Sequence, residues 1–211
     1  MKTEATLQTF QFKNLQVQAY VPDALALQEW FITQQKINSS FPSPYWAQVW
    51  PAAKAVCQFI AEQPHWVQHK KVLELAAGLG LPSLLASQFA KEITCSDYLP
   101  EAIEMIQRSI EYNGIKNMQS FLLDWNTIPP GLKADVLLLS DINYEPASFE
   151  KLYYVMEKFL TEGTTILLST PQRLMAKPFI ERLLHFCILQ KELEIKEGEP
   201  ETVCTVLVLK K

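Results

Sequence analysis

The chain has 211 residues, of which 48% are hydrophobic, 20% charged and 11% aromatic. This composition excludes an intrinsically disordered protein, and the length favours a single domain over residues 1–211. Nineteen basic and 23 acidic residues give a net charge of −4, which disfavours tight binding to nucleic acid because polyphosphates attract positively charged surfaces.

The first fifty residues contain two features that differ from the rest of the chain. Apolar and polar residues alternate over residues 10–21, which predicts a small β-hairpin. The segment Pro42–Pro51 is rich in proline and tryptophan, and a helix is expected directly after it, over Ala52–Ala61. We therefore expect a hairpin and a Pro/Trp segment in residues 1–50, followed by the core in residues 51–211.

From residue 71 onward, short apolar runs alternate with stretches of helical periodicity. This alternation is typical of βαβ units that form a parallel sheet. The predicted strands are Lys71–Leu75, Glu92–Ser96, Met118–Leu123, Asp135–Ser140 and Thr164–Thr170. Apolar residues spaced three and four apart predict helices over Leu152–Leu160 and around Ala102–Ile110, the latter beginning at Pro100 and stopping at Asn113-Gly114.

Two strand-like runs, Cys187–Ile195 and Thr202–Lys210, end the chain. The residues between them, 196–201, are too few for a crossover between parallel strands, so the two runs are predicted to form an antiparallel hairpin. The expected fold is therefore α/β, with a mostly parallel sheet, an antiparallel C-terminal hairpin strand, and helices on both faces.

Neither a membrane span nor a metal or disulfide site is indicated by the sequence. No apolar run reaches the roughly 18 residues that a membrane helix needs, and His65 and His69 have no nearby acid or thiol to complete a metal site. The four cysteines, Cys57, Cys95, Cys187 and Cys204, form no CxxC pair. We expect reduced thiols in a cytoplasmic protein that does not associate with membranes.

A strand that runs into a glycine turn carries the main functional signal. Residues 72–83 comprise a strand, the turn Gly78-Leu79-Gly80 and the start of a helix, an arrangement that lets a ligand lie against backbone N–H groups. A plain structural turn is the alternative. Ser83 stands where a dinucleotide-binding loop needs its third glycine, and the carboxylate of Glu74 would repel a pyrophosphate. The loop therefore favours a ligand with a cationic amino group over NAD.

Asp97, at the end of the second predicted strand, refines the choice of ligand. A carboxylate at this position can accept hydrogen bonds from both hydroxyls of a ribose, whereas an aspartate that caps a turn is the alternative interpretation. S-adenosylmethionine carries both an amino group and a ribose. We therefore expect S-adenosylmethionine as the cofactor.

Five segments in combination resemble a known protein family. They are Trp50-Pro51-Ala52-Ala53, Glu74–Pro82, Thr94–Tyr98, Leu123-Asp124-Trp125 and Leu139–Tyr144. Together they resemble the seven-β-strand (class I) S-adenosylmethionine-dependent methyltransferases of the lysine-methyltransferase-like group, which is methyltransferase family 16 and is similar to nicotinamide N-methyltransferase. The resemblance covers most of the chain from about residue 42 and implies a Rossmann-like fold. The glycine loop is common to all class I methyltransferases, whereas the Trp-Pro segment combined with Asp-x-x-Tyr is more particular to this group.

The resemblance also implies a role for each matching residue. The implied cofactor contacts are Gly78, Leu79 and Gly80 beside the methionine and ribose, Asp97 on the ribose hydroxyls, Trp125 beside the adenine, and Trp50 and Ser140 elsewhere on the cofactor. An indole suits a purine because both are flat and largely apolar. For Trp125, a position in the core is the alternative.

Asp141 and Tyr144 follow an apolar strand and are the expected catalytic residues. Methyl transfer from a sulfonium needs a neutral nucleophile aligned in a dry site, with no covalent residue. A carboxylate can hold an incoming ammonium, and a tyrosine offers a hydroxyl and an aromatic wall for a cationic amine. The alternatives are a turn cap for Asp141 and a packing role for Tyr144. Arg173 either contacts the substrate or is a solvated arginine at the start of a helix.

These features predict an N-methyltransferase that uses S-adenosylmethionine and acts on a protein lysine side chain. Few residues are available to enclose a small metabolite, so an open site is expected. A small-molecule amine N-methyltransferase and a non-catalytic cofactor-binding module are the alternatives. The Asp-Ile-Asn-Tyr segment lacks the two prolines of the base-methylating motif Asn/Asp-Pro-Pro-Tyr, which disfavours nucleic-acid substrates. We expect a monomer.

Overall fold

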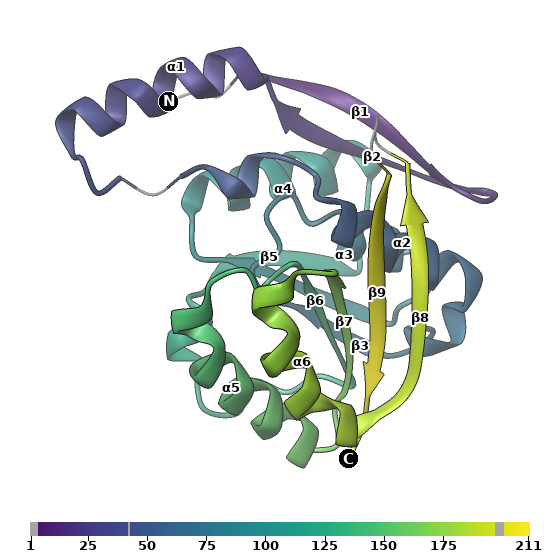
Figure 1. The fold of residues 1–211 in the computed structure, drawn as a ribbon. Helices are drawn as coiled ribbons and strands as arrows, with labels where there is room; N and C mark the ends of the chain where they lie inside the picture. The colour runs from purple at the N-terminus through teal and green to yellow at the C-terminus, as the bar shows by residue number, and fades with distance from the viewer. Residues whose placement is uncertain (1–3, 42, 197–200) are drawn as a thin grey trace.

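The computed structural model describes residues 4–41, 43–196 and 201–211, and its main element is a seven-stranded sheet (Figure 1). The strand order is β5-β4-β3-β6-β7-β9-β8. The strands are β3 (Lys71–Glu74), β4 (Glu92–Asp97), β5 (Met118–Leu122), β6 (Val136–Ser140), β7 (Thr165–Pro171), β8 (Cys187–Ile195) and β9 (Thr202–Leu209). All seven are predicted from the sequence to within one residue at each end.

The sheet is parallel from β5 to β7 and antiparallel beyond it. Strand β9 pairs antiparallel with both β7 and β8, so the C-terminal hairpin closes one edge of the sheet. This confirms the predicted mostly parallel sheet with an antiparallel C-terminal hairpin. Residues 197–200 of the predicted connection lie outside the described residues.

Helices cover both faces of the sheet, which confirms a further part of the predicted fold. On β6, the side chains of Val136 and Leu138 pack with α2 and α3, while Leu137 and Leu139 pack with α5 and α6. A strand that is buried on both faces is apolar at every position, which explains the uninterrupted apolar run. The helices are α2 (Pro51–Glu62), α3 (Leu81–Ala86), α4 (Pro100–Asn113), α5 (Phe149–Thr161) and α6 (Lys177–Leu183).

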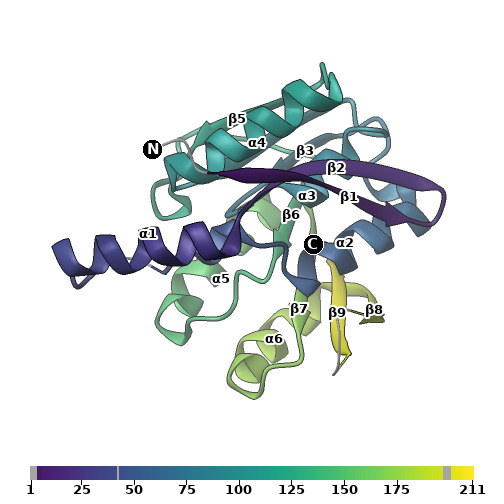
Figure 2. The same ribbon diagram turned by 90° about the horizontal axis from the view of Figure 1, so that it is seen from above.

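The N-terminal hairpin, β1 (Ala5–Phe12) and β2 (Leu15–Pro22), is confirmed and lies against α4. The backbone N–H of Tyr20 donates to the hydroxyl of Ser109 at 2.9 Å, and the Asn113 side chain donates to the carbonyl of Gln18 at 2.7 Å. These contacts fix the hairpin across the helix layer, as Figure 2 shows.

Helix α1 (Ala24–Ile37) is absent from the sequence-based prediction. Asp23 caps it by accepting a hydrogen bond from the backbone N–H of Ala26 at 2.9 Å. None of its residues is buried, and it projects from the rest of the protein in both views (Figures 1 and 2). Only Leu27 packs against a core cluster, and that only in part, so the apolar residues form no clear stripe and the sequence pattern gives little signal. Among the described residues, no helix is both long and apolar enough to cross a membrane.

Candidate active site

The loop between β3 and α3 is held in an unusual backbone conformation. Ala76, Gly78 and Gly80 all have positive φ angles, of 52°, 56° and 67°. The loop is tied to β4, since the backbone N–H of Ala77 donates to the carbonyl of Ser96 at 2.9 Å and that of Gly78 donates to the carboxylate of Asp97 at 2.9 Å. Positive φ at a non-glycine residue such as Ala76 is strained, and such strain concentrates at functional sites.

Both glycines of the turn lie in tight packing. A Cβ on Gly78 would lie 3.1 Å from the carbonyl oxygen of Trp46, because the Pro/Trp segment packs directly on the loop. A Cβ on Gly80 would lie 3.1 Å from the Sγ of Cys95 and 3.2 Å from Ile106. The missing side chain of Gly80 thus points into the core.

Replacing Gly80 by alanine is expected to destabilise the fold more than the same change at Gly114. The two glycines have similar φ angles, 67° and 63°, but nothing lies within 4 Å of a Cβ on Gly114. Gly114→Ala introduces only backbone strain, which lowers the free energy of unfolding by about 1 kcal/mol. Gly80→Ala adds overpacking, which lowers it by about 1–3 kcal/mol more. Urea unfolding of both variants measures the difference, and equal losses would contradict the packing role.

Glu74 lies behind the loop and is completely buried. Its Oε2 accepts a hydrogen bond from the backbone N–H of Ser83 at 3.0 Å and so attaches the start of α3 to β3. Its Oε1 has no hydrogen-bond partner among the described residues. Burial raises the pKa of Glu74 to about 7, and the hydrogen bonds from Ser83 oppose this rise. Glu74 does not line the cavity at the carboxyl ends of the parallel strands. The structure therefore does not bring it to the place where the expected contact with a ligand's amino group would be made.

Glu74→Gln is expected to remove a loss of stability that the wild type shows as pH rises. The folded protein holds the Glu74 proton up to about pH 7, whereas the unfolded chain releases it near 4.5. The free energy of unfolding therefore falls between these values, by about 3 kcal/mol for this group. Burial also raises the pKa of Asp97, which acts in the same direction but equally in both proteins. Urea unfolding at pH 5 and pH 8 compares them, and parallel losses would refute the assignment to Glu74.

A cavity of about 370 Å³ opens at the carboxyl ends of β3, β4 and β6. It brings together seven of the predicted site residues, namely Trp50, Gly78, Leu79, Asp97, Ser140, Asp141 and Tyr144. Glu74, Gly80 and Trp125 are outside its lining. Trp125 is half-buried on the turn after β5 and packs against the core on the α5 and α6 side.

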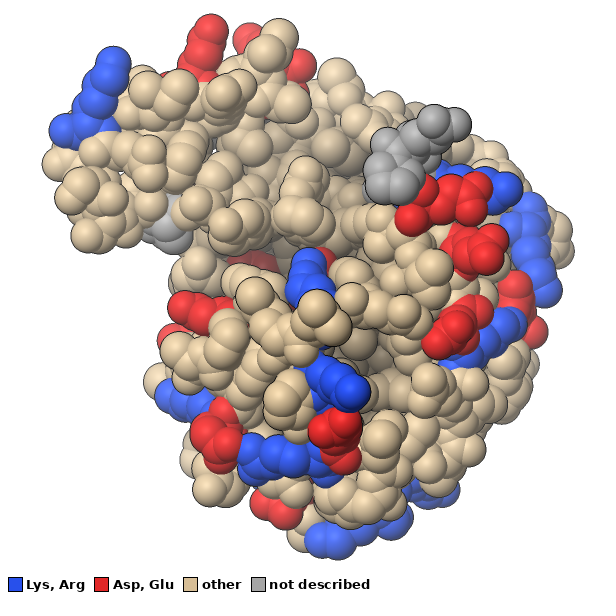
Figure 3. Space-filling view, in the orientation of Figure 1, with Lys and Arg blue, Asp and Glu red and all other residues tan. Residues whose placement is uncertain are grey.

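On the face in Figure 3, basic and acidic side chains are interspersed over the α5, α6 and β8 side of the molecule.

Asp97 connects the glycine loop to the end of β4. Its carboxylate accepts from the backbone N–H of Gly78 and, at 3.1 Å, from that of Leu99. The side chain is only 4% exposed, and this burial raises its pKa while the backbone hydrogen bonds oppose the rise. Each carboxylate oxygen keeps a second lone pair, so further hydroxyl donors in the cavity can be accepted.

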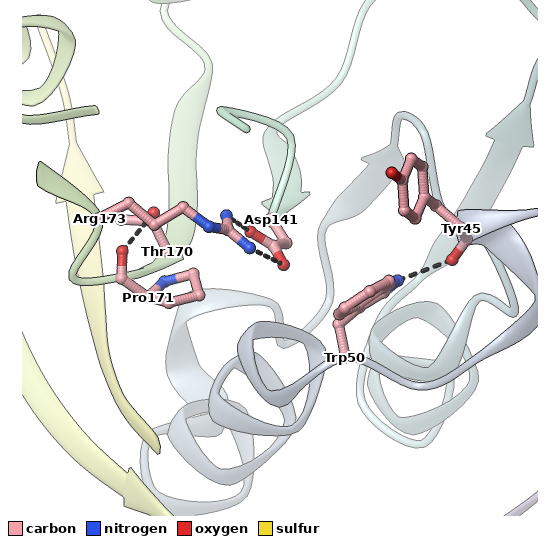
Figure 4. Close-up of polar contacts among 6 residues, drawn as sticks. All are labelled: Tyr45, Trp50, Asp141, Thr170, Pro171 and Arg173. Carbon is pink, nitrogen blue, oxygen red and sulfur yellow. Dashed lines mark hydrogen bonds and ion pairs between the residues drawn. The ribbon is translucent and has the colours of Figure 1, made fainter. Parts of the chain in front are cut away.

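Aromatic residues from distant parts of the chain form the wall of the cavity. The Trp50 indole N–H donates to the carbonyl of Tyr45 at 2.7 Å (Figure 4), and the rings of Tyr45 and Tyr144 lie 5.8 Å apart. Burial raises the pKa of Tyr144, so its hydroxyl stays protonated at neutral pH. The Pro/Trp segment thus supplies one side of the site and the residues after β6 supply the other.

Asp141 is buried, and its carboxylate forms a two-point ion pair with Arg173 (Figure 4). Arg173 Nη1 donates to Oδ1, and Nη2 donates to Oδ2 at 3.1 Å. Asp141 has a positive φ of 57°, and its backbone N–H donates to the carbonyl of Ser169 at 2.9 Å. The sequence left the role of Arg173 open. One signal for the contact with Asp141 was available. Both strands were expected in a parallel sheet, and the residues that follow paired parallel strands, here those after Ser140 and Ser169, lie at the same edge of the sheet.

The described residues hold no group of three or more His, Cys, Asp or Glu side chains that is placed to bind a metal ion. All four cysteines are free thiols in the structure, three of them buried. The polar groups that line the cavity include the carboxylates of Asp97 and Asp141, the guanidinium of Arg173 and the hydroxyls of its tyrosines.

Sequence comparison relates the chain to protein methyltransferases. A family model described as lysine methyltransferase matches residues 32–186. A histone-arginine methyltransferase of Xenopus laevis is 31% identical over 139 residues, which cover 61% of this chain and 59% of that protein. The EEF1A lysine methyltransferase 3 of Xenopus tropicalis is 32% identical over 133 residues, covering 60% and 58% of the two chains. This chain spans about half to three fifths of the length of the curated relatives it matches.

Solved structures share the fold at low sequence identity. The N-methyltransferase NodS from Bradyrhizobium japonicum, in complex with S-adenosyl-L-homocysteine, gives a TM-score of 0.62 at 12% identity, covering 85% of this chain and 98% of NodS. The T. thermophilus 16S rRNA methyltransferase RsmC, in complex with AdoMet and guanosine, gives 0.65 at 15% identity, covering 98% of this chain and 51% of RsmC. These similarities confirm the Rossmann-like fold of class I methyltransferases, and the family match confirms the resemblance drawn from the motifs.

Proposed function

Because the chain belongs to the lysine methyltransferase family, we propose that it is an enzyme that transfers a methyl group from S-adenosylmethionine to the side-chain amine of a protein lysine. One observation carries the proposal. The glycine loop and Asp97 line the same cavity as Asp141 and Tyr144, which supports a cofactor site next to a polar, aromatic acceptor site. Two lysine methyltransferases, of the electron transfer flavoprotein beta subunit and of EEF1A, are among its relatives.

The residues at the cofactor side of the cavity suit S-adenosylmethionine. Asp97 keeps free lone pairs for the ribose hydroxyls, and Leu79, Leu81 and Ile142 give an apolar lining. The volume of about 370 Å³ is within the range of small-molecule sites. Trp50, Gly78, Leu79 and Ser140 would hold the rest of the cofactor. When bound, the cofactor would supply a methyl group on a sulfonium: the acceptor nitrogen would bond to the methyl carbon as the carbon–sulfur bond breaks, and S-adenosylhomocysteine would leave.

The acceptor side of the cavity suits an amine at the tip of a long side chain. Tyr144 is 49% exposed and Tyr45 is 54% exposed, so aromatic faces line the entrance, where a cationic amine is stabilised. Asp141 lies deeper and offers carboxylate oxygens as hydrogen-bond acceptors for the amine N–H groups. This arrangement orients the nitrogen lone pair, which is a main requirement for methyl transfer.

A protein arginine is the second candidate acceptor. The histone-arginine methyltransferases among the relatives and the two-point contact of Asp141 with a guanidinium both favour it. The small-molecule amine N-methyltransferase and the non-catalytic module remain further alternatives. The cytoplasmic location, the monomeric state and the absence of nucleic-acid and membrane partners stay predictions.

Incubation with S-adenosylmethionine labelled in its methyl group and a lysate of the native host is expected to label a protein on lysine nitrogen. A lysine must lose its proton before attack, and its ordinary pKa is about 10.4, so the rate should rise from about pH 7 to 9. Amino-acid analysis of the labelled protein distinguishes lysine from arginine. Label confined to small molecules would support the small-molecule enzyme, and no label despite cofactor binding would support the non-catalytic module.

A further inference from the structure

Arg173 supplies the only positive charge among the described residues that line the cavity. It follows β7 and begins the short turn Leu174–Ala176, where its backbone N–H donates to the carbonyl of Pro171 at 2.8 Å and its own carbonyl accepts from Ala176 at 3.0 Å. Its side chain is 30% exposed, whereas that of Asp141 is 8% exposed. The guanidinium therefore reaches inward from a fixed turn to a nearly enclosed carboxylate.

The pair has a consequence for any amine that enters the cavity. An unpaired carboxylate stabilises an ammonium and so holds an amine in its protonated form, which has no lone pair for attack. A guanidinium paired with the carboxylate cancels the negative charge, but the carboxylate oxygens keep further lone pairs. The paired Asp141 can thus accept a hydrogen bond from a neutral amine without favouring the ammonium.

We propose that Arg173 is a positioning residue that neutralises Asp141, so that the acceptor binds as a hydrogen-bonded neutral amine and not as a charge-paired ammonium. This inference rests on the proposed function, because it concerns the same acceptor site. It assigns Arg173 a role in setting the protonation state of the acceptor, in addition to fixing the orientation of the Asp141 carboxylate.

Other ionisable groups face the pair from the surrounding elements. They are Tyr144 on the same loop, Tyr45 on the Pro/Trp segment, Asp97 and Tyr98 at the end of β4, Cys204 on β9, and the Lys177–Glu181 pair on α6 beside Arg173. Burial raises the pKa of Tyr98, Tyr144 and Cys204, so these groups stay neutral between pH 7 and 9. Asp97 is already held by two backbone N–H groups. Arg173 is therefore the residue whose removal changes the charge next to Asp141.

Titration with n-butylammonium, which mimics the end of a lysine side chain, tests the inference in the presence of S-adenosylhomocysteine at pH 7.5. Arg173→Met leaves Asp141 unpaired and is expected to bind the probe about tenfold more tightly than the wild type. Arg173→Lys keeps the positive charge and should stay within about threefold of the wild type. The double variant Arg173→Met with Asp141→Asn lacks the carboxylate and should lose the gain. Unchanged binding in Arg173→Met would overturn the inference.

Methylation kinetics on the labelled acceptor give a second, independent readout. Arg173→Met should show a lower KM, a kcat reduced about tenfold at pH 7.5, and a pH profile displaced upward by about one unit, with rates converging near pH 10. A purely structural role would lower the rate equally at every pH. Urea unfolding checks that the variants fold, and Arg173→Gln serves as the neutral variant if Arg173→Met does not. A wild type without any methyl transfer would refute the proposed function, while the n-butylammonium titration would still decide the role of Arg173.

Discussion

Replacing Asp141 by alanine is expected to lower turnover at least 100-fold while the affinity for S-adenosylmethionine changes less than about threefold. Asp141 lies at the acceptor side of the cavity, and loss of one positioned polar group at a reacting centre has an effect of this size. The variant leaves Arg173 without its carboxylate, but this side chain is 30% exposed and can reorient into water. Single-turnover kinetics with labelled cofactor, together with calorimetric titration of the cofactor, measure the two effects separately.

Glu145→Ala is the matched control for this prediction. Glu145 is an acidic residue on the same loop, is exposed, and does not line the cavity. Its removal should leave turnover within about twofold of the wild type. Full activity of Asp141→Ala would remove Asp141 from the reacting centre, and equal losses in both variants would indicate a general effect of acidic charge on the loop.

Replacing Asp97 by alanine is expected to weaken S-adenosylmethionine binding at least 100-fold. Two hydrogen bonds from ribose hydroxyls to a buried carboxylate are worth about 1.5–3 kcal/mol each. The variant also loses the carboxylate that accepts from Gly78 and Leu99, so the glycine loop is no longer fixed to β4. Calorimetric titration with S-adenosylmethionine and with S-adenosylhomocysteine measures the loss.

Asp124→Ala provides the comparison for Asp97. Asp124 also follows a strand, and its side chain likewise accepts from a backbone N–H, that of Asn126 at 2.8 Å, but it is exposed and outside the cavity. Its loss should change cofactor affinity less than about threefold. Wild-type affinity in Asp97→Ala would exclude the proposed ribose contact. NAD should not bind the wild type, and binding of NAD as tight as that of S-adenosylmethionine would contradict the cofactor assignment.

The elements of the sheet could be predicted because their sequence signals are local. Strands β6 and β7 are buried on both faces and therefore appear as apolar runs, and Gly114 ends α4 in the left-handed conformation that the Asn-Gly pair predicts. Helix α1 could not be predicted in the same way. It has a local cap at Asp23, but none of its residues is fully buried and Leu27 only partly packs against the core, so the helix carries no strong apolar periodicity.

Within the site, the sequence identified the types of residue but not their partners. It determined by itself that a glycine turn follows a strand, that Asp97 and Asp141 end two further strands, and that a family motif lies around Tyr144, because chain order and residue chemistry are sufficient for these statements. Only the tertiary structure decided that Glu74 faces the core, that Cys95 leaves little room for a side chain at Gly80, and that Asp141 pairs with Arg173. Those contacts join residues far apart in the sequence, and they depend on strand register and on the direction of each side chain, which packing sets across the whole fold.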